Sequence, residues 1–156
     1  YNGSSNPNNN FYAGVSMYHI TRPKESFLGA NYLANPRFTL YSGGYLGVGD
    51  NKTLYVSALH SQQAKASETL AGAALGITPN MDALKPTTIF GGVWTRFNDA
   101  VIPYLGLEVG DFRFGFTYDV NISKLKTASN SQGGIEVSLI YINKPSGEKG
   151  IPCPKF

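Results

Sequence analysis

The sequence predicts an all-β fold, an antiparallel outer-membrane β-barrel with about eight strands in this segment, which close by themselves or form part of a larger barrel. Three observations support this prediction. One segment near the C-terminus alternates strictly between apolar and polar residues, and shorter segments of the same kind recur between turn-forming residues. The third is composition: 18 Gly, 10 Tyr and 9 Phe, with only 15% charged residues, favour β structure.

The alternating segment covers residues 112–122 and reads F-R-F-G-F-T-Y-D-V-N-I. Successive side chains of a strand point to opposite faces, so one face would be apolar and aromatic and the other small, polar or charged. The second face would carry Arg113, Gly115, Thr117, Asp119 and Asn121. The segment has the length of about 9–11 residues that a membrane-crossing strand needs, and its pattern suits lipid outside and a polar lumen inside.

The predicted strands follow one another at the spacing typical of hairpins. The pattern of residues 62–76 supports a strand least clearly. Their alanine-rich composition favours helix, and their apolar positions fit neither the helical period nor the strand period. We interpret them as a strand that continues a hairpin. The eight predicted strands are residues 11–20, 37–46, 53–60, 62–76, 87–97, 100–109, 112–122 and 135–142.

The segments between these strands contain turn-forming residues. Residues 1–10 are predicted to be a loop or a cut end, and residues 21–35 a long connection. Gly43-Gly44 indicates a bulge or a close approach inside its strand. The remaining predicted connectors are residues 47–51, 77–86, 98–99, 110–111 and 123–134.

Connector length indicates how the barrel would be oriented. If the C-terminus is periplasmic, the short connector 110–111 is periplasmic and the long connector 123–134 is extracellular, as in bacterial outer-membrane barrels. Residues 98–99 would then be an unusually short outer turn, and residues 77–86 a long inner one.

The length suits one domain, so residues 1–156 are predicted to form a single β-barrel domain or the C-terminal part of one. The chain starts at Tyr1 without a methionine, which indicates a removed signal or a piece of a longer chain. Residues 144–156 contain Pro145, Pro152 and Pro154, and we expect them to form an extended periplasmic tail.

Several other classes of protein and site are disfavoured. No run of 18 apolar residues is present, so a transmembrane helix is not expected. The net charge of +3 is spread along the chain, which argues against a nucleic-acid partner. His19 and His60 lack metal-ligand spacing, Cys153 is a single cysteine, and there is no nucleophile elbow. We therefore expect no enzyme activity, cofactor or metal.

Charged and aromatic residues on the predicted strands are the candidate functional groups. The charged set would pair across the lumen, either as a structural plug of side chains or as a polar channel or binding surface. This set consists of Arg96, Asp99, Arg113, Asp119 and Glu136. The aromatic residues would form a membrane-interface girdle or pack in the core. They are Trp94, Phe97, Tyr104, Phe112 and Tyr141.

Three stretches carry a resemblance to a known family. They are F-Y-A-G-V-S-M-Y-H-I-T-R-P at residues 11–23, G-V-W-T-R-F-N-D-A-V-I-P-Y-L-G-L-E at residues 92–108, and R-F-G-F-T-Y-D-V-N-I-S-K-L at residues 113–125. The last continues as G-G-I-E-V-S-L-I-Y-I, and the chain ends in C-P-K-F. The chain resembles the later part of the PorP/SprF family of Bacteroidota type IX secretion proteins.

The resemblance implies an outer-membrane β-barrel that is not an enzyme. It implies a role in export or surface attachment of a large adhesin, including those of gliding motility. The implied partners are the secreted adhesin or its C-terminal domain, periplasmic type IX secretion lipoproteins and the lipid bilayer. The candidate lumen or partner-binding residues are Arg96, Asp99, Arg113, Tyr118, Asp119, Asn121 and Glu136.

Two other functions fit the strand pattern. The first is a small outer-membrane pore or ligand-binding barrel that acts alone. The second is a soluble β-sandwich adhesin module.

Overall fold

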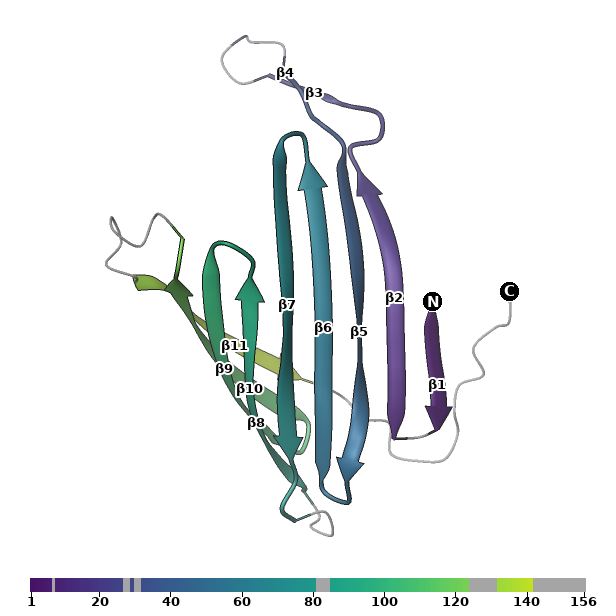
Figure 1. Ribbon diagram of the computed structural model, residues 1–156, viewed down its shortest axis with the longest axis vertical. Helices are drawn as coiled ribbons and strands as arrows, with labels where there is room; N and C mark the ends of the chain where they lie inside the picture. The colour runs from purple at the N-terminus through teal and green to yellow at the C-terminus, as the bar shows by residue number, and fades with distance from the viewer. Residues whose placement is uncertain (7, 27–28, 30–31, 81–84, 124–131, 142–156) are drawn as a thin grey trace.

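A computed structural model describes all residues except 7, 27–28, 30–31, 81–84, 124–131 and 142–156. The described residues form one antiparallel sheet of nine strands and a separate two-stranded hairpin (Figure 1). The order in the large sheet is β1-β2-β5-β6-β7-β8-β9-β10-β11, so each strand pairs with its neighbours along the chain, apart from the β3–β4 hairpin inserted between β2 and β5. A single continuous sheet excludes the sandwich architecture for these residues.

All eight predicted strands are present, with three additional short ones. The strands are β1 (Asn2–Asn6), β2 (Asn9–Tyr18), β3 (Lys24–Glu25), β4 (Tyr32–Leu33), β5 (Arg37–Gly49), β6 (Lys52–Gln63), β7 (Ala66–Ile77), β8 (Thr87–Arg96), β9 (Ala100–Val109), β10 (Phe112–Asn121) and β11 (Gln132–Tyr141). β1 and β11 are the two edges of the sheet and run in the same direction, because eight antiparallel steps separate them. The sheet is therefore not closed within the described residues, and the predicted tail at residues 144–156 lies outside them.

The prediction of a loop at residues 1–10 is wrong. Asn2–Asn6 forms β1, and β2 begins at Asn9. Local composition suggested a loop because Asn and Ser side chains compete with strand formation. Here these side chains instead link the two strands: Asn10 Nδ2 donates to Asn2 Oδ1 at 2.9 Å, and Ser4 Oγ donates to the carbonyl of Asn9 at 2.7 Å.

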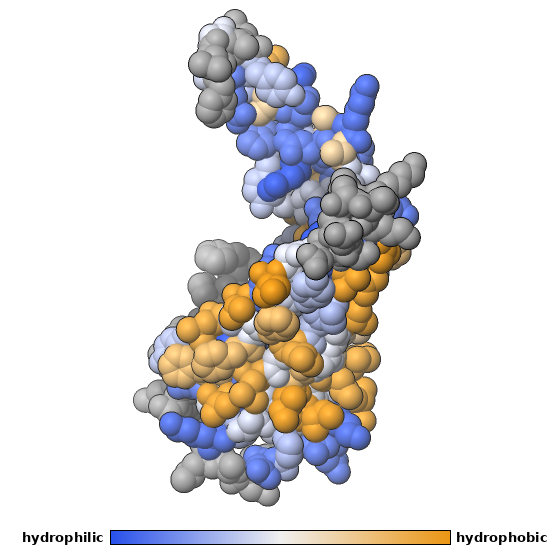
Figure 2. All heavy atoms as spheres, turned by 90° about the vertical axis from the view of Figure 1, so that its left-hand side faces the viewer, coloured by the Kyte–Doolittle hydropathy of each residue, from blue (hydrophilic) through white to orange (hydrophobic). Residues whose placement is uncertain are grey.

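The two faces of the sheet differ in chemistry. Cross-strand rows alternate between apolar residues, such as Leu105, Phe116 and Val137, and polar ones, such as Tyr104, Thr117 and Glu136. The apolar residues are widely exposed, up to 78% for Val137. Figure 2 shows them gathered in a broad patch on the face that it presents. A surface of this kind suits contact with hydrocarbon, as the alternating pattern of residues 112–122 predicted.

The polar face is the concave one, and aromatic rings pack there against glycines of adjacent strands. A β-carbon built on Gly72 would collide with Trp94, and one on Gly43 would collide with Tyr12. Each glycine therefore accommodates a ring from the neighbouring strand, an arrangement that stabilises glycine within a sheet. Trp94 and Tyr104 contact each other edge to face, with their ring centroids 5.7 Å apart. These two residues thus have the second of their predicted roles, core packing, and do not belong to a girdle.

The same packing explains why the alanine-rich segment is a strand. β7 pairs with β6 over its full length, from Ala66 opposite Gln63 to Ile77 opposite Lys52. Rings from β6 and β8 lie over its concave glycines Gly72 and Gly76, and Ala74 between them is buried. The small residues that suit this packing give the segment an alanine-rich composition, and such a composition by itself favours helix.

The Gly43-Gly44 prediction is confirmed as a close approach. Pairing between β5 and β6 is regular through both glycines, and the irregularity lies between Gly47 and Gly49. A β-carbon on Gly44 would collide with the backbone of Asn10 on β2.

The connections divide between two ends of the sheet, which we call upper and lower as drawn in Figure 1. The lower end carries the turns at residues 50–51 and 110–111 and the connection at residues 78–86. The upper end carries the turns at residues 64–65 and 97–99, the β2–β5 connection and the β10–β11 connection. β7 pairs with β8 only from Leu70 onward, so the tops of β5, β6 and β7 rise above the upper ends of β8–β10.

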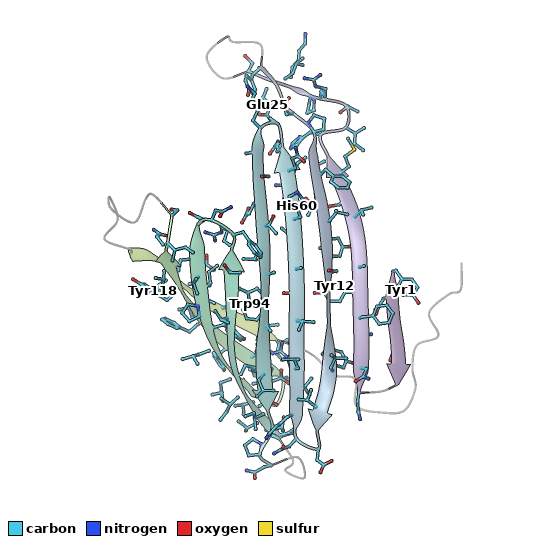
Figure 3. All side chains as sticks on the ribbon, viewed as in Figure 1. Tyr1, Tyr12, Glu25, His60, Trp94 and Tyr118 are labelled. Atoms are coloured by element: carbon cyan, nitrogen blue, oxygen red, sulfur yellow. The ribbon has the colours of Figure 1, made fainter. Side chains whose placement is uncertain are left out.

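The β3–β4 hairpin lies above these three strands and together with their tops forms what we call the upper projection (Figures 1 and 3). Its position is held by specific contacts. Gln63 Nε2 donates to the carbonyl of Asn35 at 3.0 Å, and the amide of Ala34 donates to the carbonyl of Pro23 at 3.0 Å. Ala34 is buried. The segment that follows the hairpin is therefore hydrogen-bonded to the upper end of β6.

We expect Phe116→Arg to lower the free energy of unfolding in lipid vesicles by about 2–4 kcal/mol, because Phe116 lies mid-strand on the apolar face and arginine is poorly accommodated there. Urea titration followed by Trp94 fluorescence measures this. Phe116→Leu, which keeps the position apolar, is the control and should change stability much less. An arginine variant as stable as the parent would show that this face does not meet lipid.

We expect Gly72→Ala to destabilise the protein by about 1–3 kcal/mol, because the added methyl group overlaps Trp94 in a packed region. Gly91→Ala is the matched control, since a β-carbon at Gly91 meets nothing within 4 Å. The same unfolding assay compares them. Equal effects of the two substitutions would contradict the proposed ring packing.

Candidate functional site

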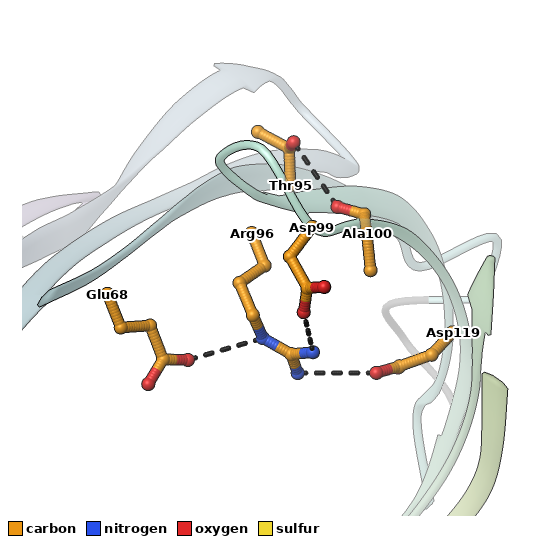
Figure 4. Close-up of polar contacts among 6 residues, drawn as sticks. All are labelled: Glu68, Thr95, Arg96, Asp99, Ala100 and Asp119. Atoms are coloured by element: carbon orange, nitrogen blue, oxygen red, sulfur yellow. Dashed lines mark hydrogen bonds and ion pairs between the residues drawn. The ribbon is translucent and has the colours of Figure 1, made fainter. Parts of the chain in front are cut away.

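Arg96 is the centre of a charged cluster at the upper end of the concave face. Its guanidinium contacts three carboxylates: Nε lies 3.2 Å from Glu68 Oε1, Nη1 lies 3.0 Å from Asp99 Oδ2, and Nη2 lies 3.2 Å from Asp119 Oδ2. Figure 4 shows the sheet curving around these four side chains. We call them the Arg96 cluster.

Each carboxylate of the Arg96 cluster comes from a different part of the sheet. Glu68 lies on β7, Asp99 in the β8–β9 turn and Asp119 on β10. Asn98 adopts a left-handed backbone conformation, with φ of 63°, which closes this tight turn. The carbonyl of Asp99 also accepts hydrogen bonds from the amides of Ile122 at 2.8 Å and Ser123 at 3.0 Å. The turn is thereby tied to the end of β10 as well as to Arg96.

The charge and burial of this cluster favour a structural cross-link. One guanidinium faces three carboxylates, so the cluster has a net charge of −2 when all four groups are ionised. Exposed ion pairs contribute little individually, but Asp119 is only 16% exposed and shares its partner with two other groups. The planar fork of arginine can bind several oxygens at once, which lysine cannot do with the same geometry.

A second charged group lies on the concave face toward the lower end. Arg113 on β10 donates through Nε to Glu108 Oε2 on β9 at 2.8 Å, and its Nη2 contacts the same oxygen. The guanidinium carbon of Arg113 also lies 4.7 Å from the centroid of the Phe90 ring. Phe90 is buried and Glu108 nearly so, so this pair belongs to the packing of the concave face.

The structure brings three predicted residues together and separates the other four. Arg96, Asp99 and Asp119 belong to the Arg96 cluster, whereas Arg113 pairs elsewhere. Glu136 lies on the concave face of β11 opposite Thr117, and Asn121 lies on that face opposite Ala100. Tyr118 lies opposite Ile135 on the apolar face. The functional roles of all seven stay predictions.

Sequence reasoning missed two acidic residues of these groups. Glu108 was within reach of prediction, because a two-residue turn at 110–111 places Val109 opposite Phe112 and therefore Glu108 opposite Arg113. Glu68 gave no comparable signal. It lies in the alanine-rich segment, where the apolar pattern does not indicate which face a side chain occupies.

A small cavity of about 280 Å³ lies on the concave face and is bordered by Arg113. Aromatic rings form most of its wall, and Trp94 Nε1 donates to Ser57 Oγ at 2.9 Å. The rings of Tyr45, Tyr55 and Phe90 follow one another with centroids 6.1 and 5.7 Å apart. Aromatic side chains therefore line this part of the concave face. The described residues contain no cluster of His, Cys, Asp and Glu suited to hold a metal ion.

We expect Arg96→Gln to lower the free energy of unfolding by about 1–3 kcal/mol, because three carboxylates lose their shared partner and repel one another. Adding Asp119→Asn should recover part of this loss, which a double-mutant cycle in urea would measure. Arg37→Gln is the control, because the guanidinium of Arg37 lies 4.5 Å from the centroid of the Tyr18 ring and forms no ion pair with a carboxylate of the described residues. It should lower the free energy of unfolding less than Arg96→Gln does. Strictly additive effects of the Arg96 and Asp119 substitutions would contradict the network.

Comparison with known proteins agrees with this architecture. Among the described residues, no helix is long and apolar enough to cross a membrane. Searches of curated proteins and of solved structures gave no match. A family model described as type IX secretion system membrane protein PorP/SprF matches residues 3–141, which confirms the resemblance found in the sequence. The chain belongs to the PorP/SprF family of type IX secretion system membrane proteins.

Proposed function

We propose that this protein is a non-enzymatic outer-membrane component of the type IX secretion system. It anchors a large surface adhesin of the gliding-motility type or assists its export, and it contacts periplasmic secretion components. The observation that carries this proposal is the upper projection, a mostly polar structure that rises beyond the apolar face of a protein of this family.

The surface of the upper projection supports contact with another protein. Figure 2 shows it as a mostly hydrophilic region above the apolar patch. Large apolar side chains are nevertheless exposed here: Tyr32 on β4 is 64% exposed, Leu33 beside it is exposed, and so is Ile20 in the connection that leads to the hairpin. These residues lie away from the lipid-contacting patch, and exposed apolar groups with a polar rim are typical of protein interaction sites. A secreted adhesin or its C-terminal domain is the partner that we propose for them.

The two ends of the sheet support a definite orientation. Outer-membrane barrels have longer connections outside and shorter turns on the periplasmic side. We therefore propose that the upper end faces outward and the lower end faces the periplasm. Periplasmic lipoproteins would then meet the lower end, together with the tail predicted at residues 144–156.

The side chains of the concave face favour an anchoring role, and they argue against an open pore. Aromatic rings pack against glycines across β2, β5 and β7–β10, and two charged groups hold adjacent strands together. Such a surface favours a rigid scaffold over a wide aqueous channel.

A photo-reactive amino acid in place of Tyr32 should cross-link to a secreted surface protein in intact cells, because Tyr32 is exposed on the upper projection. The same amino acid in place of Asp50, in a lower turn, is the matched control and should capture periplasmic components instead. Mass spectrometry of products purified in mild detergent identifies them. Capture of the secreted protein from position 50 but not from position 32 would overturn the proposed orientation and surface.

A further inference from the structure

A hollow of about 560 Å³ lies at the lower end of the apolar face, beside the β9–β10 turn. Its apolar wall comes from Val109, Phe112 and Phe114, which are all exposed. The ring of Phe112 also packs on Tyr141 of β11, with their centroids 5.1 Å apart. The apolar wall is thus continuous with the surface that meets acyl chains in a membrane protein.

Two residues of opposite charge border this hollow, Lys85 and Asp111. The amide of Gly110 donates to the carbonyl of Pro86 at 3.4 Å, which holds the segment containing Lys85 against the β9–β10 turn. A β-carbon at Gly110 would lie 3.7 Å from Lys85 Cδ, so the methylene stem of Lys85 runs along the turn that contains Asp111. Both residues are exposed, and within the described part of the chain no ion pair joins them.

We propose that this hollow binds a phospholipid whose headgroup carries a phosphate and a primary ammonium group, as in phosphatidylethanolamine. The phosphate contacts the Lys85 ammonium, the lipid ammonium donates to the Asp111 carboxylate, and an acyl chain lies on Phe112 and Phe114. Lys85 and Asp111 border the same hollow, so they offer this zwitterion one charge of each sign. The inference rests on membership of a membrane-protein family and is independent of adhesin anchoring.

The charge pair distinguishes among phospholipids. A choline headgroup has no N–H to donate to Asp111, and a glycerol headgroup has no positive charge for it. All three headgroups contain a phosphate for Lys85. The lysine therefore supplies general phospholipid affinity, and the aspartate supplies preference for the primary amine.

The test is lipid retention by the purified protein. The protein is reconstituted in nanodiscs that contain equal amounts of phosphatidylethanolamine, phosphatidylcholine and phosphatidylglycerol, returned to detergent and analysed by native mass spectrometry. We expect retention of phosphatidylethanolamine over the other two by about threefold to fivefold, the ratio that one exposed charged contact to Asp111 can supply. Asp111→Ala, which removes the acceptor, should abolish this preference, and Lys85→Ala should lower retention of all three lipids.

The β5–β6 turn provides a matched control. It lies at the same lower end and also carries an aspartate and a lysine, Asp50 and Lys52. Asp50→Ala and Lys52→Ala should leave lipid retention unchanged. Equal retention of the three lipids by the parent protein, or equal losses from both turns, would overturn the proposal. Unfolding midpoints of all variants show whether a change in retention comes from loss of fold.

Discussion

The packing of aromatic rings on glycines of neighbouring strands is the interaction on which the rest of this structure depends. Trp94 over Gly72 and Tyr12 over Gly43 show the arrangement, which recurs along the concave face.

The curvature of the sheet brings the Arg96 cluster together. β8 and β10 are two strand spacings apart, about 9–10 Å along a flat sheet. Because the sheet curves around Arg96, Asp119 on β10 reaches it at 3.2 Å. The Arg96 cluster then links the ends of β7, β8 and β10.

The two faces and the two ends have separate roles as a result. The concave face is occupied by side chains that bind one another, which leaves the apolar face for lipid. The upper projection carries exposed apolar residues in polar surroundings, and the lower end carries charged turns beside the apolar surface. Partner binding and lipid binding are therefore proposed at opposite ends, and substitutions at one end should leave the other intact.

Much of the fold was predictable wherever the alternation was strict. Residues 112–122 have one pattern from end to end, and β10 (Phe112–Asn121) matches them within one residue. Prediction failed where packing overrides composition. The Asn- and Ser-rich N-terminal residues contribute to β1 (Asn2–Asn6) and to the start of β2 at Asn9, and their side chains bond across this strand pair. β7 is rich in Gly and Ala because rings lie over its concave glycines. Glu68 was missed because it lies in β7, where the small residues do not indicate which face a side chain occupies.

The sequence by itself determined the all-β class, the family and the face on which most strand residues lie. These depend on a period of two residues and on local motifs, which are visible without knowledge of neighbouring strands. Only the tertiary structure decided which charges meet. Arg96 binds Glu68 and Asp119, and Lys85 lies beside the turn of Asp111, because curvature and register bring together segments that are distant in the chain.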